Sequence, residues 1–590
     1  MKKINGCKIM NFKNRFVVKV VGESGQGVNS IGEVLAKALK DNGLFIFGYR
    51  EYPSLIKGGD ASYQIDINNQ EIKSSSAQCD VLMCLVRSSF KKYLTSVRKN
   101  GSIIHSVVKL TLTPEEEFFV KENKINIEFI PAKDIAIELG GKRIMSNTIM
   151  LGAIWQIFGL EIRKMEDNIK EIFSKKPDVI EINLKCLNAG FNYDLSKLQR
   201  PKLEIRQTEN FKDDLLMSGN HAISLGAIAA GVRVFYAYPM TPSSSILSYL
   251  SSVYHETGMI VKQIEDEISV ANMAIGSMHM GARTMIATSG GGFDLMTEAV
   301  SLTGITETPF VCVIAQRPGP GTGLPTWTSA SDLNLAIYSG HGEYTKCVIA
   351  AHDIASCYTV TQQAFNIAEK YQIPVIILTE KQIAESIFQV DKMPQDIPIE
   401  RHILEGEELK NITSLDRYKN TESGVSPRWL PGSCDAVFDA NSDEHLSDGS
   451  LTEDAFPAKE IYQKRIRKEE YLLKDLPEPE VFGSQDPDIS FVGWGSVKNT
   501  MLDVMDILNE RGKKKIAYLH YEYVYPLKIG VFQNFAKNAK KLVLIENNAT
   551  GQLGNLITSK TGVLFKNRLM KFDGRPFFLE DIIEYIESEE

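Results

Sequence analysis

Short apolar segments alternate with amphipathic ones along most of this chain. Runs of Val, Ile, Leu and other apolar residues predict buried strands, the clearest of which lie at residues 16–21, 80–86, 234–237, 284–288 and 310–316. Between them stand helical patterns, in which apolar residues recur three and four positions apart, as at residues 31–39 and 271–278. Strands that alternate with helices form parallel sheets. The pattern therefore predicts an α/β protein with three parallel-sheet domains.

Changes in composition divide the 590 residues, which are too many for one hydrophobic core. The predicted divisions are a first α/β domain at residues 1–193, a charged linker at 194–214, a second domain at 215–396, a charged segment with Pro, Asp and Ser at 397–477, and a third domain at 478–590. The segment at 397–477 is expected to be extended, to cross the surface and to be available to a partner.

Charge and hydropathy exclude two classes of function. The formal net charge of −8 argues against a dedicated nucleic-acid-binding protein. The chain contains no apolar stretch of roughly 18 residues, and its first residues are not followed by an apolar segment, so we expect a cytoplasmic protein without a membrane anchor. The eight cysteines are scattered and none forms a Cys-x-x-Cys pair. A zinc or iron–sulfur site within this chain is therefore not expected, and most of the cysteines are expected to be small buried residues.

Two glycine-bearing loops in the first domain are candidate anion sites. Residues 22–27 place three glycines in the spacing G-x-x-G-x-G between a strand and a helix, where backbone N–H groups can face a phosphate. The spacing departs from the dinucleotide motif and no Walker lysine follows, so a tight turn is the preferred interpretation. Lys57, in the second loop at residues 52–60, is more typical of a solvated side chain than of an anion ligand.

The second domain has a stiff turn at residues 238–245, Tyr-Pro-Met-Thr-Pro-Ser-Ser-Ser. Pro239 and Pro242 restrict the backbone on both sides of Thr241. The serines that follow suit the start of a helix, whose N–H groups favour an anion. A fixed hydroxyl beside an anion site suits a small carboxylate substrate, although an ordinary strand-to-helix turn explains so short a motif equally well.

Other polar residues follow neighbouring strands. Glu267 and the glycine run that begins after Ser289 also stand at strand-to-helix junctions, so we expect them to share one crevice with Thr241 at the carboxyl ends of a parallel sheet. Glu265 and Asp266 are interpreted as helix-dipole compensation, and the pattern alone does not decide the role of Glu267.

Three further features outside these junctions carry weaker signals. The Pro/Gly-rich loop at residues 317–328 is typical of functional or mobile loops. His341 is more typical of a structural histidine than of a catalytic one. Residues 546–552, Glu-Asn-Asn-Ala-Thr-Gly-Gln, suit either a ligand or a neighbouring domain, and the domain interface is preferred.

Taken together, these motifs resemble the α subunit of 2-oxoacid:ferredoxin oxidoreductases, in the form with a γ-type domain fused at the N-terminus. Residues 238–244 match the family's Tyr-Pro-Ile-Thr-Pro-Ser-Ser motif, residues 265–290 resemble the pyrimidine-binding domain of thiamine-diphosphate enzymes, and residues 546–552 resemble the transketolase C-terminal domain. The resemblance covers nearly the whole chain, and the order and spacing of the motifs are more specific than any one of them.

The resemblance implies roles for individual residues. Glu267 would hydrogen-bond the aminopyrimidine ring of thiamine diphosphate, the cofactor that takes up the electrons as CO₂ leaves. Thr241 would hold the substrate carboxylate or oxo group. The remaining expected contacts are Ser243, Trp327 and Thr328 to the substrate, and Ser289, Gly290 and Gly291 to the cofactor.

The resemblance also implies a partner. The Gly-Asp-Gly signature that holds magnesium and diphosphate in thiamine enzymes does not occur in this chain. A β subunit is therefore expected to bring Mg²⁺, the diphosphate site and a [4Fe-4S] cluster, with no metal on this chain. The assembled enzyme would act on a 2-oxoacid and coenzyme A and pass electrons to ferredoxin, and the single chain would be inactive.

Trp327 departs from the family pattern. Many relatives carry Arg or Lys between the two threonines of a Pro-Thr-x-Thr loop, where this chain has tryptophan. Because tryptophan offers an apolar face and no ion pair, we predict a substrate less acidic than 2-oxoglutarate, such as pyruvate or a branched or aromatic 2-oxoacid.

Three other functions compete with this interpretation. A non-catalytic scaffold or regulatory protein could keep the fold, although the presence of Thr241 and Glu267 argues against it. A self-contained thiamine-dependent decarboxylase is disfavoured because the diphosphate motif does not occur. A nucleotide-binding protein built on residues 22–27 has the weakest support.

Overall fold

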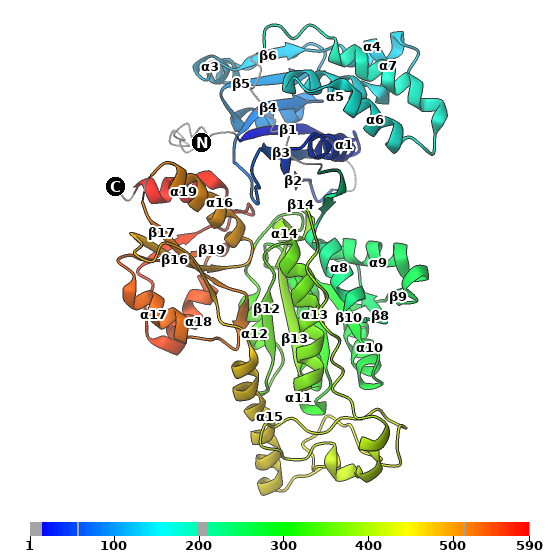
Figure 1. Ribbon diagram of the computed structural model, residues 1–590, viewed down its shortest axis with the longest axis vertical. Coiled ribbons are helices and arrows are strands. Elements are labelled where there is room, and N and C mark those ends of the chain that lie inside the picture. Colours follow the sequence, from blue (N-terminus) through cyan, green and yellow to red (C-terminus); the bar gives the residue numbers. More distant parts are fainter. Residues whose placement is uncertain (1–14, 56–57, 199–210, 513, 589–590) are drawn as a thin grey trace.

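The chain forms three sheets, each covered by helices, in a computed structural model that describes residues 15–55, 58–198, 211–512 and 514–588 (Figure 1). The predicted α/β class is confirmed. Lys57 and most of the predicted linker at residues 194–214 lie outside the described residues. Among the described helices, none is both long and apolar enough to cross a bilayer.

The first sheet is mixed rather than purely parallel. Its own strands are β1 (Phe16–Glu23), β2 (Phe45–Glu51), β3 (Asp60–Asn68), β4 (Cys79–Cys84), β5 (Val97–His105) and β6 (Asn126–Phe129). β1, β4, β5 and β6 are parallel, whereas β3 pairs antiparallel with both β1 and β2. Its helices are α1 (Val28–Asp41), α2 (Arg87–Tyr93), α3 (Pro114–Glu122), α4 (Ala132–Glu138), α5 (Ser146–Phe158), α6 (Ile162–Ile172) and α7 (Ile180–Phe191).

The second sheet carries the candidate site. Its parallel strands are β8 (Val234–Ala237), β9 (Ile260–Gln263), β10 (Thr284–Thr288), β11 (Phe310–Gln316), β12 (Cys347–Ala350) and β13 (Pro374–Glu380), in the order β12-β13-β11-β10-β8-β9. Its helices are α8 (Gly219–Ala229), α9 (Ser244–Thr257), α10 (Glu267–His279), α11 (Gly290–Thr306), α12 (Leu333–Tyr338), α13 (Ile354–Tyr371) and α14 (Lys381–Glu385). The buried faces of β10, β11 and β13 are continuous apolar runs, as expected for strands covered on both sides.

The third sheet has the order β15-β17-β16-β19-β20. Its strands are β15 (Glu480–Gly483), β16 (Ile489–Trp494), β17 (Ile516–Tyr521), β19 (Leu542–Glu546) and β20 (Asn567–Met570), and its helices are α16 (Val497–Glu510), α17 (Gly530–Asn538), α18 (Gln552–Thr561) and α19 (Leu579–Ser588). All of these strands are parallel except β15.

Three short strands join neighbouring sheets. β14 (Ile387–Val390) pairs with β2 of the first sheet, and β7 (Leu215–Met217) pairs with β14. β18 (Tyr523–Tyr525), which follows β17 in the sequence, pairs with β12 of the second sheet. The sheets therefore do not follow the predicted domain divisions at these strands, and the three modules are joined by backbone hydrogen bonds.

The expectation that residues 397–477 are extended is wrong for the last part of that segment. Residues 455–475 form α15 (Ala455–Asp475), which stands beside the lower end of the second module (Figure 1). The segment also contains two short 3₁₀ turns, at Gly406–Asn411 and Ser414–Asp416.

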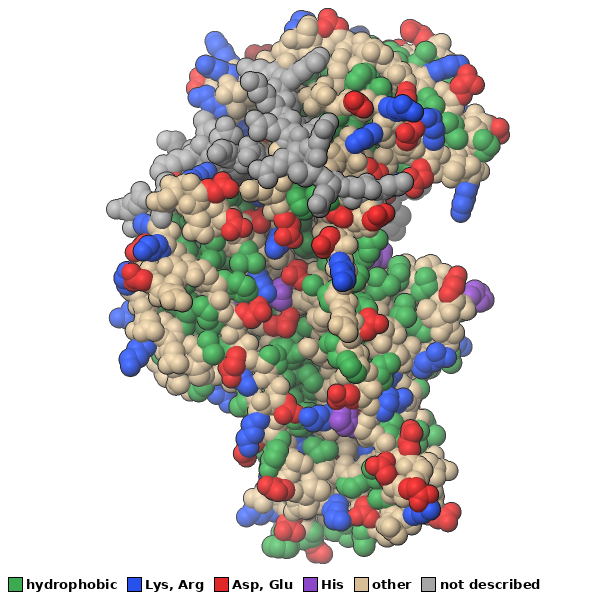
Figure 2. Space-filling model, viewed as in Figure 1, with side chains coloured by type: hydrophobic (Ala, Val, Ile, Leu, Met, Phe, Trp, Pro, Cys, Tyr) green, Lys and Arg blue, Asp and Glu red, His purple; other side chains and the backbone are tan. Residues whose placement is uncertain are grey.

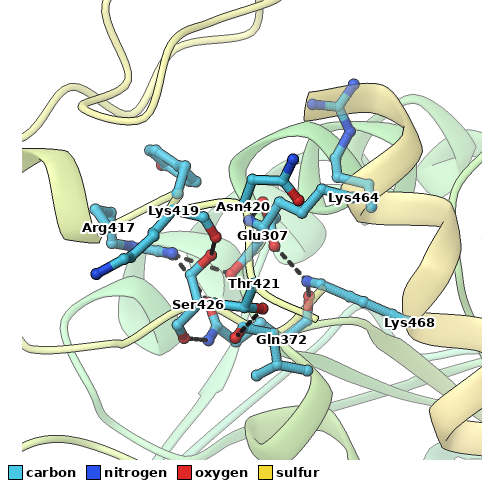
Figure 3. A network of polar contacts seen from close by, with 12 residues as sticks. Glu307, Gln372, Arg417, Lys419, Asn420, Thr421, Ser426, Lys464 and Lys468 are labelled. Atoms are coloured by element: carbon cyan, nitrogen blue, oxygen red, sulfur yellow. Dashed lines mark hydrogen bonds and ion pairs between the residues drawn. The ribbon is translucent and has the colours of Figure 1, made fainter. Parts of the chain in front are cut away.

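A buried charge cluster fastens α15 to the end of α11 (Figure 3). Glu307, which follows α11, forms one ion pair with Lys464, at 2.5 Å, and a second one with Lys468. All three side chains are buried. Arg417, from the same segment, donates to the backbone carbonyl of Glu307 and to Gln372. Burial opposes ionisation of Glu307, but the surrounding cations outweigh it and hold its pKa well below the ordinary value.

The surface agrees with the charge balance. On the face shown in Figure 2, acidic and basic side chains are interspersed over all the modules.

The expected burial of most cysteines is confirmed for Cys79, Cys84, Cys186, Cys312, Cys347 and Cys357, while Cys434 is half-buried and Cys7 lies outside the described residues.

Candidate cofactor and substrate site

The carboxyl ends of β8, β9, β10 and β11 lie at one edge of the second sheet, because these strands are parallel neighbours. The turn with Thr241 follows β8, Glu267 follows β9 at the start of α10, and Ser289 follows β10. The sequence predicted this shared edge. Ligands of open α/β sheets bind at the carboxyl ends of the strands, so a binding site is expected at this edge.

Glu267 is the central polar group of this edge. Its side chain belongs to the first residue of α10 and is only 4% exposed. Gly292 of α11 faces it so closely that an added Cβ would lie 2.8 Å from Glu267 Oε1. Within the described residues, the carboxylate makes no hydrogen bond or ion pair with the protein. A nearly buried carboxylate is costly without a partner, so this arrangement indicates a polar ligand.

The neighbouring Asp266 has a local role. Its side chain accepts a 3.0 Å hydrogen bond from the backbone N–H of Ser269 and caps α10. That backbone hydrogen bond is the main cause that lowers the pKa of Asp266. This role at the start of α10 agrees with the interpretation of Asp266 as helix-dipole compensation.

The turn with Thr241 is held from three directions. Arg317 donates a 2.9 Å hydrogen bond to the carbonyl of Thr241, and Asn220 donates one of 2.8 Å to the carbonyl of Pro242. The Ser243 hydroxyl donates to the carbonyl of Met240 at 2.7 Å. The Thr241 side chain is half-buried. Ser243 therefore stabilises the turn, and the expected contacts of Ser243 and Thr241 with substrate stay predictions.

The start of α11 supplies a second set of groups without a protein partner. Ser289 is fully buried, and its Oγ has no hydrogen-bond partner among the described residues. Gly290 packs against Asp332, because a Cβ added to Gly290 would lie 2.5 Å from Asp332 Oδ2. Asp332 Oδ2 is also buried and has no hydrogen-bond partner among the described residues. Gly291 is exposed. Burial, together with the nearby Asp294, raises the pKa of Asp332 to about 7.

The loop at residues 317–332, which we call the crossing loop, connects all three modules. Thr326 Oγ1 donates to the carbonyl of Tyr52 in the first module at 2.7 Å. Thr328 Oγ1 donates to Glu380 Oε2 at the end of β13 at 2.9 Å. The N–H of Ala330 donates to the carbonyl of Asn547 in the third module at 2.8 Å. Because the Thr328 hydroxyl is buried and used in this way, its expected contact with substrate stays a prediction.

Trp327 lies in the middle of the crossing loop and is half-buried. The guanidinium of Arg575 covers it, with Cζ 3.4 Å from the ring centroid. Arg575 could not be predicted from the sequence, since nothing in the residues around it connects it to a loop in another module.

The remaining candidate features are two loops and one histidine. In the loop at residues 22–27, an added Cβ on Gly27 would lie 2.7 Å from Asn147 Nδ2, and that amide donates to the carbonyl of Gln26 at 2.8 Å. These contacts agree with the preferred tight turn. The turn at 546–552 contacts the crossing loop, because Asn548 Nδ2 donates to the carbonyl of Ala330 at 2.9 Å, so the preferred interface interpretation is confirmed. His341 is exposed.

Two family models match the chain. Residues 17–193 match the family "Pyruvate ferredoxin/flavodoxin oxidoreductase", and residues 225–459 match "Pyruvate flavodoxin/ferredoxin oxidoreductase, thiamine diP-bdg". The chain is also 28% identical to the 2-oxoacid:ferredoxin oxidoreductase subunit alpha of Sulfolobus sp., over 95% of each chain. The chain belongs to the 2-oxoacid:ferredoxin oxidoreductase family, as an α-type subunit.

Further members of this family agree with the assignment. The 2-oxoglutarate oxidoreductase subunit KorA of Mycobacterium tuberculosis is 27% identical, over 97% of this chain and 91% of that protein. Among solved structures, the 2-oxoglutarate:ferredoxin oxidoreductase from Magnetococcus marinus, with 2-oxoglutarate, coenzyme A and succinyl-CoA bound, matches with a TM-score of 0.90 at 28% identity, over 98% of this chain and 100% of that one. The oxidoreductases of this family depend on thiamine diphosphate.

The described residues of this α-type subunit fit the pyrimidine half of that cofactor. Glu267 and Ser289 are buried, and within the described chain neither the Glu267 carboxylate nor the Ser289 hydroxyl has a hydrogen-bond partner. Gly292 lets α11 approach the carboxylate more closely than any residue with a side chain would allow. The donor set therefore matches a flat, polar heterocycle bound against α10 and α11.

Proposed function

We propose that this chain is the α subunit of a complex that oxidatively decarboxylates a 2-oxoacid to acyl-CoA and CO₂ and passes the electrons to ferredoxin. The observation that carries the proposal is the Glu267 carboxylate, which is nearly buried at the carboxyl edge of the second sheet and has no partner among the residues that the structure describes. The family assignment supports it.

In this proposal, Glu267 hydrogen-bonds a ring nitrogen of thiamine diphosphate and holds a proton there, while Ser289, Gly290 and Gly291 line the cofactor. When bound, the cofactor supplies an electron sink for the loss of CO₂. Thr241 orients the 2-oxoacid by a hydrogen bond from a turn that Arg317 fixes. The crossing loop covers the edge and excludes water.

We propose that a β subunit completes the site. It would contribute Mg²⁺, the diphosphate-binding groups and the [4Fe-4S] cluster, and it would dock over the ends of α10 and α11, where Glu267 and Gly291 lie. Support comes from the sequence, which lacks the Gly-Asp-Gly signature. The single chain would then be inactive, and the cytoplasmic location stays a prediction.

A substitution of Glu267 by Gln tests the proposal. The variant and a control, Glu265→Gln at an exposed neighbouring carboxylate, are each co-purified with the β subunit without oxygen. With several 2-oxoacids, coenzyme A and ferredoxin, we expect Glu267→Gln to reduce the rate by about 10²–10⁴-fold, the usual contribution of a positioned acid–base group, while the control retains the parental rate.

The same experiment separates the alternatives. A complex that assembles but turns over no 2-oxoacid, even with Glu267 intact, would indicate the non-catalytic scaffold. Turnover by the purified single chain would indicate a self-contained decarboxylase. An active complex that is indifferent to Glu267→Gln would remove Glu267 from the mechanism.

A further inference from the structure

Arg575 of the third module is fixed over the crossing loop by contacts of the backbone around it. The N–H of Thr328 donates to the carbonyl of Gly574 at 3.2 Å. An added Cβ on Gly574 would lie 3.2 Å from the Cβ of Trp327. The guanidinium then stacks on the indole, with Cζ 3.4 Å from the centroid. Stacking of this kind orients a guanidinium as well as stabilising it.

The guanidinium keeps one edge available. Nη1 donates to the carbonyl of Asp573 at 3.2 Å, and Nε lies 3.8 Å from Glu51 Oε1. Within the described part of the chain, Nη2 meets no hydrogen-bond acceptor, and the side chain is 34% exposed. A planar fork with one free edge can bind a carboxylate.

Charges from all three modules surround Arg575, and positive charge is in excess. The cations are Lys19, Arg50, Lys381 and Arg575, and the carboxylates are Glu51 and Glu385. Burial opposes ionisation of Glu51, but Lys19, Arg575 and Lys381 outweigh it and lower its pKa. Tyr52 donates to Glu385 Oε1 at 2.7 Å. Among these six side chains, cations outnumber carboxylates by four to two, which favours an anionic ligand.

The crossing loop connects this charge to the substrate turn. At the start of the loop, Arg317 donates to the carbonyl of Thr241. Farther along the same loop, the indole of Trp327 stacks against the guanidinium of Arg575. The Thr241 turn and Arg575 therefore contact the same loop, at residues ten positions apart in the sequence.

We propose that Arg575 is a substrate-binding residue that pairs with the second carboxylate of a dicarboxylic 2-oxoacid. This inference rests on the proposed function. It changes what Trp327 means for specificity: the indole serves as the platform for a cation from another module, and its exposed face is charged instead of apolar. The prediction of a less acidic substrate, made from Trp327 alone, is the competing outcome.

The test compares two substrates of the same chain length in the assembled complex, 2-oxoglutarate and 2-oxopentanoate, which lacks the second carboxylate. Loss of a charged hydrogen bond corresponds to about 10- to 100-fold in kcat/KM. We expect Arg575→Gln to lower kcat/KM for 2-oxoglutarate by that factor, mainly through KM, and to change that for 2-oxopentanoate by less than about threefold. Arg575→Lys, which keeps the charge but loses the planar fork, should lie between parent and Arg575→Gln.

A matched control is Arg568→Gln, because Arg568 is an exposed arginine of the same module whose hydrogen bonds in the described structure go to Thr550, Asn555 and Phe565, all within that module. It should leave both substrates unchanged. The inference is overturned if Arg575→Gln affects both 2-oxoacids equally, if it raises only the KM for coenzyme A, or if the parent complex prefers 2-oxopentanoate. A parent complex that turns over neither 2-oxoacid, nor pyruvate or a branched 2-oxoacid, would instead refute the proposed function.

Discussion

At the scale of single residues, Asp332 is a carboxyl group placed beneath Gly290 at the start of α11. Burial is the main cause that raises its pKa from an ordinary 3.8 to about 7, and Asp294 adds to it, while Arg317 works in the opposite direction. An acid whose pKa is higher in the folded chain favours folding in its protonated form. Its contribution to stability is complete below about pH 4, declines as the pH rises, and is lost above about pH 7.

We therefore expect Asp332→Asn to stabilise the chain increasingly as the pH rises. The melting temperature of the variant should exceed that of the parent most at pH 8, and the difference should shrink towards pH 5. Thermal melts followed by circular dichroism across this range measure the effect. The exposed Asp443→Asn serves as control, and a difference that does not depend on pH would show that Asp332 is already ionised in the folded chain.

At the scale of elements, α15 depends on a carboxylate outside it. Lys464 and Lys468 point from α15 into the protein and share Glu307, and both lysine side chains are at most 2% exposed. Replacing Glu307 by Gln keeps the shape but leaves two buried ammonium groups without a counter-charge. Breaking a buried ion pair in this way costs about 3–5 kcal/mol.

Because that cost falls on the attachment of one helix, we expect Glu307→Gln to release α15 before the rest of the chain unfolds. Trypsin should cut at the lysines and arginines of residues 455–475 at least tenfold faster than in the parent. Glu343→Gln is the matched control, because Glu343 contacts Tyr462 of the same helix but is exposed. Equal cleavage rates for all three proteins would mean that the cluster does not hold the helix.

Elements whose signal is local could be predicted from the sequence. The apolar runs that became β8, β10 and β11, and the helices between them, follow from periodicity, and their parallel order brings Thr241, Glu267 and Ser289 to one edge. Residues 455–475 were predicted to be part of an extended segment and form α15 instead, because the partner of their buried lysines, Glu307, is distant in the sequence. In the same way, β14 lacks any local signal that assigns it to the first sheet.

The residues of the candidate site also differ in whether a local sequence motif identifies them. Glu267 and Thr241 stand in recognisable motifs, and so does Trp327. The cation over Trp327 was not foreseen, since Arg575 belongs to another module and its neighbours carry no motif. The direction in which a hydroxyl points also depends on tertiary packing. The Ser243 and Thr328 hydroxyls donate hydrogen bonds to other groups of the protein, which the residue type alone does not reveal.

At the scale of the whole molecule, the modules are interlocked. β14 and β18 each complete a neighbouring sheet, and the crossing loop bonds to all three modules. The site therefore depends on the relative position of modules that are far apart in the sequence. Between the first and third modules this position is fixed by polar groups buried where α16 and α19 meet residues 73–77.

Asp503 of α16 is the central group of that interface. Its Oδ2 accepts hydrogen bonds from the Ser74 hydroxyl at 2.6 Å and the Lys73 N–H at 3.1 Å, and it lies 3.3 Å from Arg15 Nη1. Burial is the main cause that raises its pKa, which Arg15 partly offsets. Replacing Asp503 by Ala leaves a buried guanidinium and two buried donors poorly satisfied, at a cost of about 3–5 kcal/mol.

Since this cost falls on the contact between modules and not inside either one, Asp503→Ala should uncouple them. We expect one calorimetric transition for the parent chain and two for the variant, together with faster amide exchange at residues 73–77 and in the crossing loop, which the third module helps to hold. Asp506→Ala, one turn along the same helix and exposed, should behave like the parent. Asp503→Ala could instead lower the temperature of a single transition and leave amide exchange in the crossing loop unchanged. The modules would then be coupled through β14 and β18, because those strands would be sufficient to keep the third module in place over the site.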